Sequence, residues 1–221
     1  MKLFYLTSAQ FGVAAVALKR LKISRFSDLN DPFELLAVNL ADPMHRTAFR
    51  GLKDELNKNR GLLCFSQTWE NPVIWGHYAE KHTGVALGFT VPDHLPVKVD
   101  YAKRPMKISV DKATNKIALS EANVSKLLRT KFFDWKYENE WRIFVGLDHS
   151  TQESGMYFMD FVPSLVLSDV ILGTRCSIPR ERIIDLLRDT RQDVIVRQAR
   201  MAFQSFKVVE HLGHRPGKHE A

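Results

Sequence analysis

The chain has 221 residues, of which 45% are hydrophobic and 26% charged, so its composition is that of a folded globule and excludes an intrinsically disordered chain. No stretch approaches the roughly 18 uncharged apolar residues of a membrane-spanning helix, and the opening residues lack the apolar core of a secretory signal. We therefore expect a cytoplasmic protein with no membrane partner. The formal net charge of +7 favours acidic partners, such as nucleic acid or a phosphate-bearing cofactor, without naming one.

Glycines, prolines and capping residues divide the chain into a mixed series of strands and helices. The elements expected in the first part are a strand at residues 3–6, a helix at 9–18, a strand at 22–24, a turn at 28–32 and an amphipathic helix at 43–59. Further on, we expect strands at 61–66, 85–89, 98–101, 141–145, 169–172 and 193–197, with helices at 72–79, 120–130 and 179–189. With no internal repeat or linker, this pattern predicts a single α+β domain over residues 1–210 and a flexible basic tail at 211–221.

Three charged residues occur at alternate positions late in the chain. If residues 137–145 form a strand, its two-residue period places Glu138, Glu140 and Arg142 on one face and apolar side chains on the other. Two neighbouring carboxylates repel each other unless a cation compensates, and Arg142 is the candidate for that cation. The plainer alternative is a solvent-facing strand with an incidental ion pair.

The helix expected at 72–79 carries Trp75 and Tyr78, which are three positions apart and so share one face. Two rings on one face can form a wall for a flat ligand; the alternative is that both are core or boundary aromatics with hydrogen-bonded polar tips. His77 and His82 are five positions apart, which sends them to different sides of a helix. The two cysteines are far apart in the chain, so we expect reduced thiols and no metal site.

Several common signatures are missing. No Gly-rich phosphate loop, Gly-x-Ser-x-Gly elbow or His-Glu-x-x-His motif occurs, which weighs against P-loop enzymes, serine hydrolases and zinc proteases. Asn30 belongs to a turn with the chemistry of a helix start. We expect the basic excess to be a solvated surface, because no interleaving of aromatic and basic residues typical of single-strand binding is evident.

Five motifs, in this order, resemble a bacterial family catalogued as domain of unknown function 2971. They are Ser27-Asp28-Leu29-Asn30-Asp31-Pro32-Phe33-Glu34, Cys64-Phe65-Ser66, Trp75-Gly76-His77-Tyr78-Ala79, residues 84–89 and residues 135–142. The resemblance runs from the first strand to about residue 173. The family carries no stated activity, so this likeness implies kinship and no reaction.

More distantly, the order of elements around these motifs resembles the ADP-ribosyltransferases, which split a small mixed sheet around a NAD cleft. That resemblance implies a split sheet with flanking helices, and NAD as the substrate. By position, Tyr78 resembles the ring that stacks on nicotinamide, Phe65 the opposing wall, Glu140 the catalytic glutamate and Glu138 the first member of a Glu-x-Glu pair. The other residues implied at the cofactor are Ser66, Tyr5, Asn30, His77 and Arg142. Tyr5 lies on the first strand, where those enzymes carry an Arg or a His.

The resemblance therefore predicts an enzyme that transfers ADP-ribose from NAD to a nucleic acid or a protein, as a toxin or phage-defence effector does. Glu140 would stabilise the oxocarbenium-like charge that forms on the ribose as nicotinamide leaves. Two other hypotheses stay open. One is a non-catalytic module that binds nucleic acid or protein through its basic surface, and the other is a metal-dependent nuclease that uses Asp31, Glu138 and Glu140.

Overall fold

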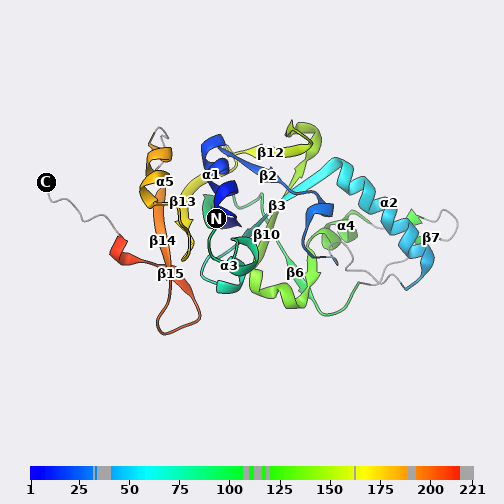
Figure 1. Ribbon diagram of the computed structural model, residues 1–221. Helices are drawn as coiled ribbons and strands as arrows, with labels where there is room; N and C mark the ends of the chain where they lie inside the picture. Colours follow the sequence, from blue (N-terminus) through cyan, green and yellow to red (C-terminus); the bar gives the residue numbers. More distant parts are fainter. Residues whose placement is uncertain are drawn as a thin grey trace.

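The computed structural model describes residues 1–31, 33, 41–106, 110–111, 116–117, 120–161, 163–188 and 193–214. Within these residues the chain is a mixed α/β domain in which helices flank a large sheet (Figure 1). The helices are α1 (Ala9–Leu18), α2 (Pro43–Asn59), α3 (Pro72–Tyr78), α4 (Glu121–Leu128) and α5 (Arg180–Leu187). The strands are β1 (Lys2–Thr7), β2 (Arg20–Ile23), β3 (Arg60–Ser66), β4 (Val85–Thr90), β5 (Val97–Lys98), β6 (Asp100–Ala102), β7 (Val110–Asp111), β8 (Lys116–Ile117), β9 (Thr130–Phe132), β10 (Glu140–Gly146), β11 (Thr151–Glu153), β12 (Met156–Asp160), β13 (Val166–Leu172), β14 (Ile195–Met201) and β15 (Val208–Glu210).

The main sheet of the described residues has eight strands in the order β15-β14-β13-β4-β1-β3-β10-β5. Strands β13 and β14 are parallel, with α5 between them in the chain, and the other neighbouring pairs are antiparallel. Strand β1 pairs with β4 along its whole length, but with β3 it shares a single registered pair, Phe4 with Ser66. No further registered pair joins these two strands within the described residues.

Apolar side chains cover both faces of this sheet, because successive residues of each strand point to opposite sides. On one side β1, β3 and β4 pack against α1 and α5 in the largest core cluster. On the other side two smaller clusters lie apart, one beneath α3 around Trp75 and one beneath α2 and α4 around Phe49 and Leu127. The space between the two smaller clusters is where the polar residues gather.

Local signals in the sequence located several elements correctly. The helices predicted at 9–18 and 43–59 are confirmed as α1 and α2, and Ser8 caps α1 by accepting a hydrogen bond from the amide of Phe11 at 3.2 Å. Asn71 caps α3 in the same way. The strand predicted at 98–101 is divided between β5 and β6, and the helix predicted at 120–130 ends at Leu128. The hairpin β11–β12 was not predicted.

The strand predicted at 141–145 is confirmed as β10, but the longer strand over 137–145, on which the argument about one charged face depended, does not form. Phe133–Glu138 form a short 3₁₀ helix, Asn139 takes a left-handed conformation with φ of 46°, and β10 begins at Glu140. Asparagine adopts this conformation more readily than most residues, so the chain can bend there. Parts of the predicted turn at 28–32, of the helix at 179–189 and of the tail at 211–221 lie outside the described residues. In the part of the chain that is described, no helix has the length and apolar character needed to cross a membrane.

Candidate functional site

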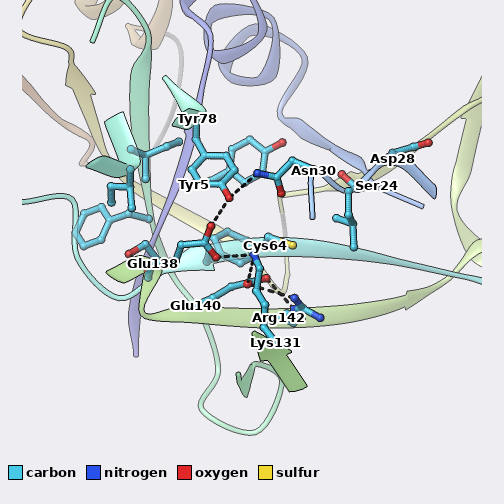
Figure 2. A pocket seen from close by; sticks show the side chains of 16 residues that line it. Tyr5, Ser24, Asp28, Asn30, Cys64, Tyr78, Lys131, Glu138, Glu140 and Arg142 are labelled. Atoms are coloured by element: carbon cyan, nitrogen blue, oxygen red, sulfur yellow. Dashed lines mark hydrogen bonds and ion pairs between the residues drawn. The ribbon is translucent and has the colours of Figure 1, made fainter. Parts of the chain in front are cut away.

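A cavity of about 270 Å³ lies between the two smaller clusters (Figure 2). Its walls come from β1, β3, β10 and α3, from residues 24–30 and from Lys131 of β9. Tyr5 and Phe65 also line the cavity, together with the residues before and after each of them on β1 and β3. Tyr5 and Phe65 lie on the neighbouring strands β1 and β3, with their ring centroids 5.9 Å apart, close to the single registered pair that joins these strands.

The bend at Asn139 positions the two glutamates, and hydrogen bonds from the end of β3 and from the segment after it hold this bend. The hydroxyl of Ser66 donates to the backbone oxygen of Glu138 at 2.7 Å. The side-chain amide of Asn71 donates to the oxygen of Tyr137 at 3.0 Å, and the amide of Gln67 donates to the oxygen of Asn139 at 3.1 Å. Glu138 therefore ends a helical turn and Glu140 begins a strand, and both side chains reach the same cavity.

Glu138 is a buried carboxyl with two polar partners. Its side chain accepts a hydrogen bond from the hydroxyl of Tyr78 and one from the ammonium of Lys131 at 2.6 Å. Burial raises the pKa of Glu138 to about 7, and the charge of Lys131 opposes that rise without cancelling it. The group therefore changes protonation near neutral pH.

Glu140 is equally buried, but two cations hold it ionised. The guanidinium of Arg142 donates to its two oxygens, at 2.7 Å from Nε and 3.2 Å from Nη2, and Lys131 approaches at 3.2 Å. Burial acts to raise the pKa of Glu140, but the charges of Arg142 and Lys131 outweigh it and lower the pKa to about 2. Arg142 is itself fixed by donating to the backbone oxygen of Leu128 at 2.8 Å. The two glutamates thus have the same residue type and opposite pKa shifts.

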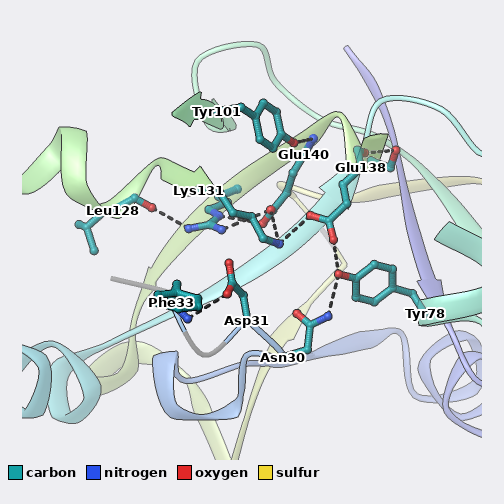
Figure 3. Close-up of polar contacts among 11 residues, drawn as sticks. Asn30, Asp31, Phe33, Tyr78, Tyr101, Leu128, Lys131, Glu138 and Glu140 are labelled. Carbon is teal, nitrogen blue, oxygen red and sulfur yellow. Dashed lines mark hydrogen bonds and ion pairs between the residues drawn. The ribbon is translucent and has the colours of Figure 1, made fainter. Parts of the chain in front are cut away.

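The aromatic side of the cavity is built around Tyr78, the last residue of α3. The side-chain amide of Asn30 donates to its hydroxyl at 3.0 Å, and the hydroxyl donates on to Glu138 (Figure 3). Burial and the charge of Glu138 raise the pKa of Tyr78, which keeps it a neutral donor. Tyr5 faces the cavity from β1, and burial raises its pKa to about 12, so it too is neutral.

Asp31 is a further buried acid beside this network. One of its oxygens accepts a hydrogen bond from the amide of Phe33 at 2.9 Å, and the other has no hydrogen-bond partner among the described residues. Figure 3 shows its carboxylate turned toward the Lys131 side of the cluster. Within the described residues, no group of three or more His, Cys, Asp or Glu side chains is arranged to hold a metal ion.

The structure brings together most of the residues that the sequence singled out. Those that line the common cavity are Tyr5, Asn30, Phe65, Ser66, Tyr78, Glu138, Glu140 and Arg142. His77 does not line it, because its ring points among Trp135 and Tyr137. Trp75 is a core residue, fully buried, with its indole nitrogen donating to the oxygen of Trp69 at 2.6 Å. The alternative of a solvent-facing charged strand is wrong, because Glu138, Glu140 and Arg142 are at most 4% exposed.

Lys131 is the central residue that the sequence did not single out. It lies 5% exposed in β9, which pairs with β6, and its ammonium reaches both Glu138 and Glu140. The available signal was a lysine within the short apolar run Lys131-Phe132-Phe133, where a charge needs a buried partner. With Arg142, it balances the two glutamates, so these four side chains together carry no net charge when all are ionised.

Comparisons with known proteins support the expected resemblance to one family over part of the chain. The family model described as Protein of unknown function (DUF2971) matches residues 74–143. No curated protein and no solved structure matches the chain. The matched segment contains Tyr78, Lys131, Glu138, Glu140 and Arg142. Over residues 74–143, which carry the core of the polar cluster, the chain is therefore similar to this family of proteins of unknown function.

Proposed function

We propose that this chain is an ADP-ribosyltransferase-like enzyme that binds the nicotinamide–ribose end of NAD in the cavity and transfers ADP-ribose to a nucleic-acid or protein acceptor. The observation that carries the proposal is the pair of neighbouring carboxyl groups on one cavity whose pKa values are pushed apart, to about 7 for Glu138 and about 2 for Glu140. Sites that transfer glycosyl groups use this division, in which one carboxyl moves a proton and the other stays ionised.

In the proposed reaction the bond between ribose C1′ and the nicotinamide nitrogen breaks, and its electron pair leaves with neutral nicotinamide. The ionised carboxylate of Glu140 stabilises the positive charge that develops on the ribose. Glu138, when ionised, takes the proton of the acceptor hydroxyl or amine while the acceptor atom forms the new bond to C1′. Lys131 contacts both carboxylates, so it keeps Glu140 charged and limits how far burial raises the pKa of Glu138.

The cavity fits one end of the cofactor better than the whole. Its volume of about 270 Å³ lies just below the range of about 300–1000 Å³ for pockets that hold drug-sized ligands, so a dinucleotide would extend out of it. Tyr5, Phe65 and Tyr78 supply aromatic surface to the lining. A cationic nicotinamide ring against such a face gains about 0.5–2 kcal/mol. The four balanced charges add no net positive field that would repel it.

The test is release of nicotinamide from labelled NAD by the purified protein. Glu140→Gln should lower the rate by roughly 100-fold or more, because the charge that stabilises the transition state is lost. Glu138→Gln should also lower the rate, since no group remains to take the acceptor proton. Glu181→Gln, on the exposed side of α5, is the matched control and should leave the rate unchanged.

The melting temperature of each variant separates loss of chemistry from loss of folding. If NAD at millimolar concentration is neither turned over nor able to raise the melting temperature of the wild type, the proposed function is wrong. Turnover that Glu138→Gln and Glu140→Gln leave intact would move the reaction to another site.

A further inference from the structure

The hairpin formed by β14 and β15 presents two aromatic rings to solvent. Phe203 is 90% exposed and Phe206 is 98% exposed, the largest exposed fractions among the large hydrophobic side chains that the structure describes. The connection between the strands is closed by a hydrogen bond from the amide of Ala202 to the oxygen of Lys207 at 2.9 Å. Two almost fully exposed rings three positions apart on one hairpin offer flat apolar faces to a ligand.

The base of this hairpin is firmly held, so the rings project from a defined support. Val208 is fully buried in the cluster that also contains Trp75, and its amide donates to the oxygen of Glu70 at 2.8 Å. Arg197 forms ion pairs with Asp169 at 2.9 Å and with Glu210 at 3.2 Å. Figure 1 shows the connection extending from the sheet on the side of β15. A rigid support lowers the entropy lost when a ligand binds the rings.

Cations accompany the two rings, and acids are absent from this part of the sequence. The guanidinium carbon of Arg200 lies 4.5 Å from the centre of the Phe203 ring. Lys207, which follows Phe206 directly, forms an exposed ion pair with Glu70 at 2.8 Å, and an exposed pair of this kind is weak enough for a phosphate to compete with it. Residues 194–209 contain three basic residues and no Asp or Glu. Along the sequence the two rings lie between two basic residues, Arg200 near the end of β14 and Lys207 before β15, so aromatic and basic side chains meet at this hairpin although they do not alternate one by one.

We propose that this hairpin binds single-stranded nucleic acid. Unpaired bases stack on exposed aromatic faces, and neighbouring cations meet the phosphates, which is the combination found in sequence-tolerant single-strand binding. A membrane is the weaker fit, because Gln204 and Ser205 separate the two rings and leave little continuous apolar surface. The chain's net charge of +7 adds long-range attraction for a polyanion. This surface is separate from the cavity and does not depend on its chemistry.

The experiment measures fluorescence anisotropy of labelled poly-U and poly-dT oligonucleotides of about a dozen bases, a length within the usual site size. Phe203→Ala and Phe206→Ala should each weaken binding by between about fivefold and a hundredfold, the range for losing one stacked base. Phe203→Trp should retain binding, since it keeps an aromatic face. Phe11→Ala, which removes an exposed ring from α1, is the matched control and should have no effect.

Salt and a site variant complete the test. The logarithm of the binding constant should fall with the logarithm of salt concentration with a slope of about −1.4 if two phosphates are contacted. Glu140→Gln should bind as the wild type does, which keeps this proposal distinct from the proposed enzyme. Failure of the wild type to bind at low salt, or binding that both alanine variants leave unchanged, overturns the proposal. So would variants whose only defect is in binding anionic vesicles or in self-association, because the rings would then serve a membrane or a second copy of the chain.

Discussion

The cavity and the β14–β15 hairpin depart from the usual placement of side chains in opposite directions. In the cavity, Glu138 and Glu140 are each 4% exposed, whereas Phe203 and Phe206 at the hairpin are 90% and 98% exposed. The buried charges are compensated inside the fold by Lys131 and Arg142. The two exposed rings have little protein packed against them; the guanidinium of Arg200 lies over the ring of Phe203. The difference indicates that the cavity is held together by its own contacts, while the hairpin is available for an external partner.

The largest expected effect comes from removing a cation at the cavity. Arg142→Ala should lower the free energy of unfolding by about 3–5 kcal/mol, because the buried carboxylate of Glu140 loses the cation that donates to both of its oxygens and the oxygen of Leu128 loses the donor Arg142. Arg188→Ala is the control, since it removes an exposed ion pair with Asp185 and should change stability by no more than about 0.5 kcal/mol. Urea unfolding measures the free energy of unfolding of both variants. Equal effects would show that burial does not distinguish the two sites.

The pH dependence of stability tests the raised pKa of Glu138. Its pKa is 4.5 in the unfolded chain and about 7 in the folded protein, so between these values the folded protein binds a proton that the unfolded chain has released. The stability contributed by this proton is complete below about pH 4.5 and is lost as the pH rises through 7. Relative to Glu138→Gln, the wild type should lose on the order of 1–3 kcal/mol between pH 4.5 and pH 7.5.

Thermal unfolding of the wild type and Glu138→Gln across that pH range measures the difference. Glu140 contributes in the opposite sense and at lower pH: its lowered pKa means that stability is lost as the pH falls from about 4.5 toward 2. The pH range over which Glu138 changes stability therefore lies above the range over which Glu140 does. A difference between wild type and Glu138→Gln that stays constant from pH 4.5 to pH 7.5 would contradict the raised pKa.

A smaller effect is expected at the aromatic wall of the cavity. Tyr78→Phe removes the hydroxyl that donates to Glu138 and accepts from Asn30, and should cost about 1–2 kcal/mol of stability. Because that hydrogen bond lowers the pKa of Glu138, its loss should raise the pKa further and move the loss of stability to higher pH. Tyr157→Phe, at a half-buried position of β12, is the control. It should change neither the free energy of unfolding nor the pH at which stability is lost.

The smallest change in stability is expected at the hairpin. Phe203→Ser and Phe206→Ser should each alter the free energy of unfolding by no more than about 0.5 kcal/mol, since the rings are already in water. Phe89→Ala, which empties a fully buried position, should by contrast cost about 3–5 kcal/mol. Chemical denaturation of the three variants makes the comparison. A large loss on serine substitution would mean that the rings pack within the fold.

Local chemistry was sufficient to predict some features of this protein. The bounds of α1 and α2 follow from capping residues and from the 3.6-residue period of apolar side chains, both of which act over a few residues. Glu138, Glu140, Arg142 and Tyr78 could be named as a candidate cluster because the order of motifs brought them to attention. Their types and spacing did not reveal that they are buried or that the two glutamates have opposite pKa shifts.

The tertiary structure decided what surrounds each of these residues. Lys131 lies in β9, which pairs with β6, and the cavity is lined by strands, a helix and a loop that are far apart in the sequence. Phe203 and Phe206 stay in solvent although Phe65 and Phe89, of the same residue type, are core side chains. Burial depends on which distant segments cover a given face, and residue-by-residue periodicity contains no information about that covering.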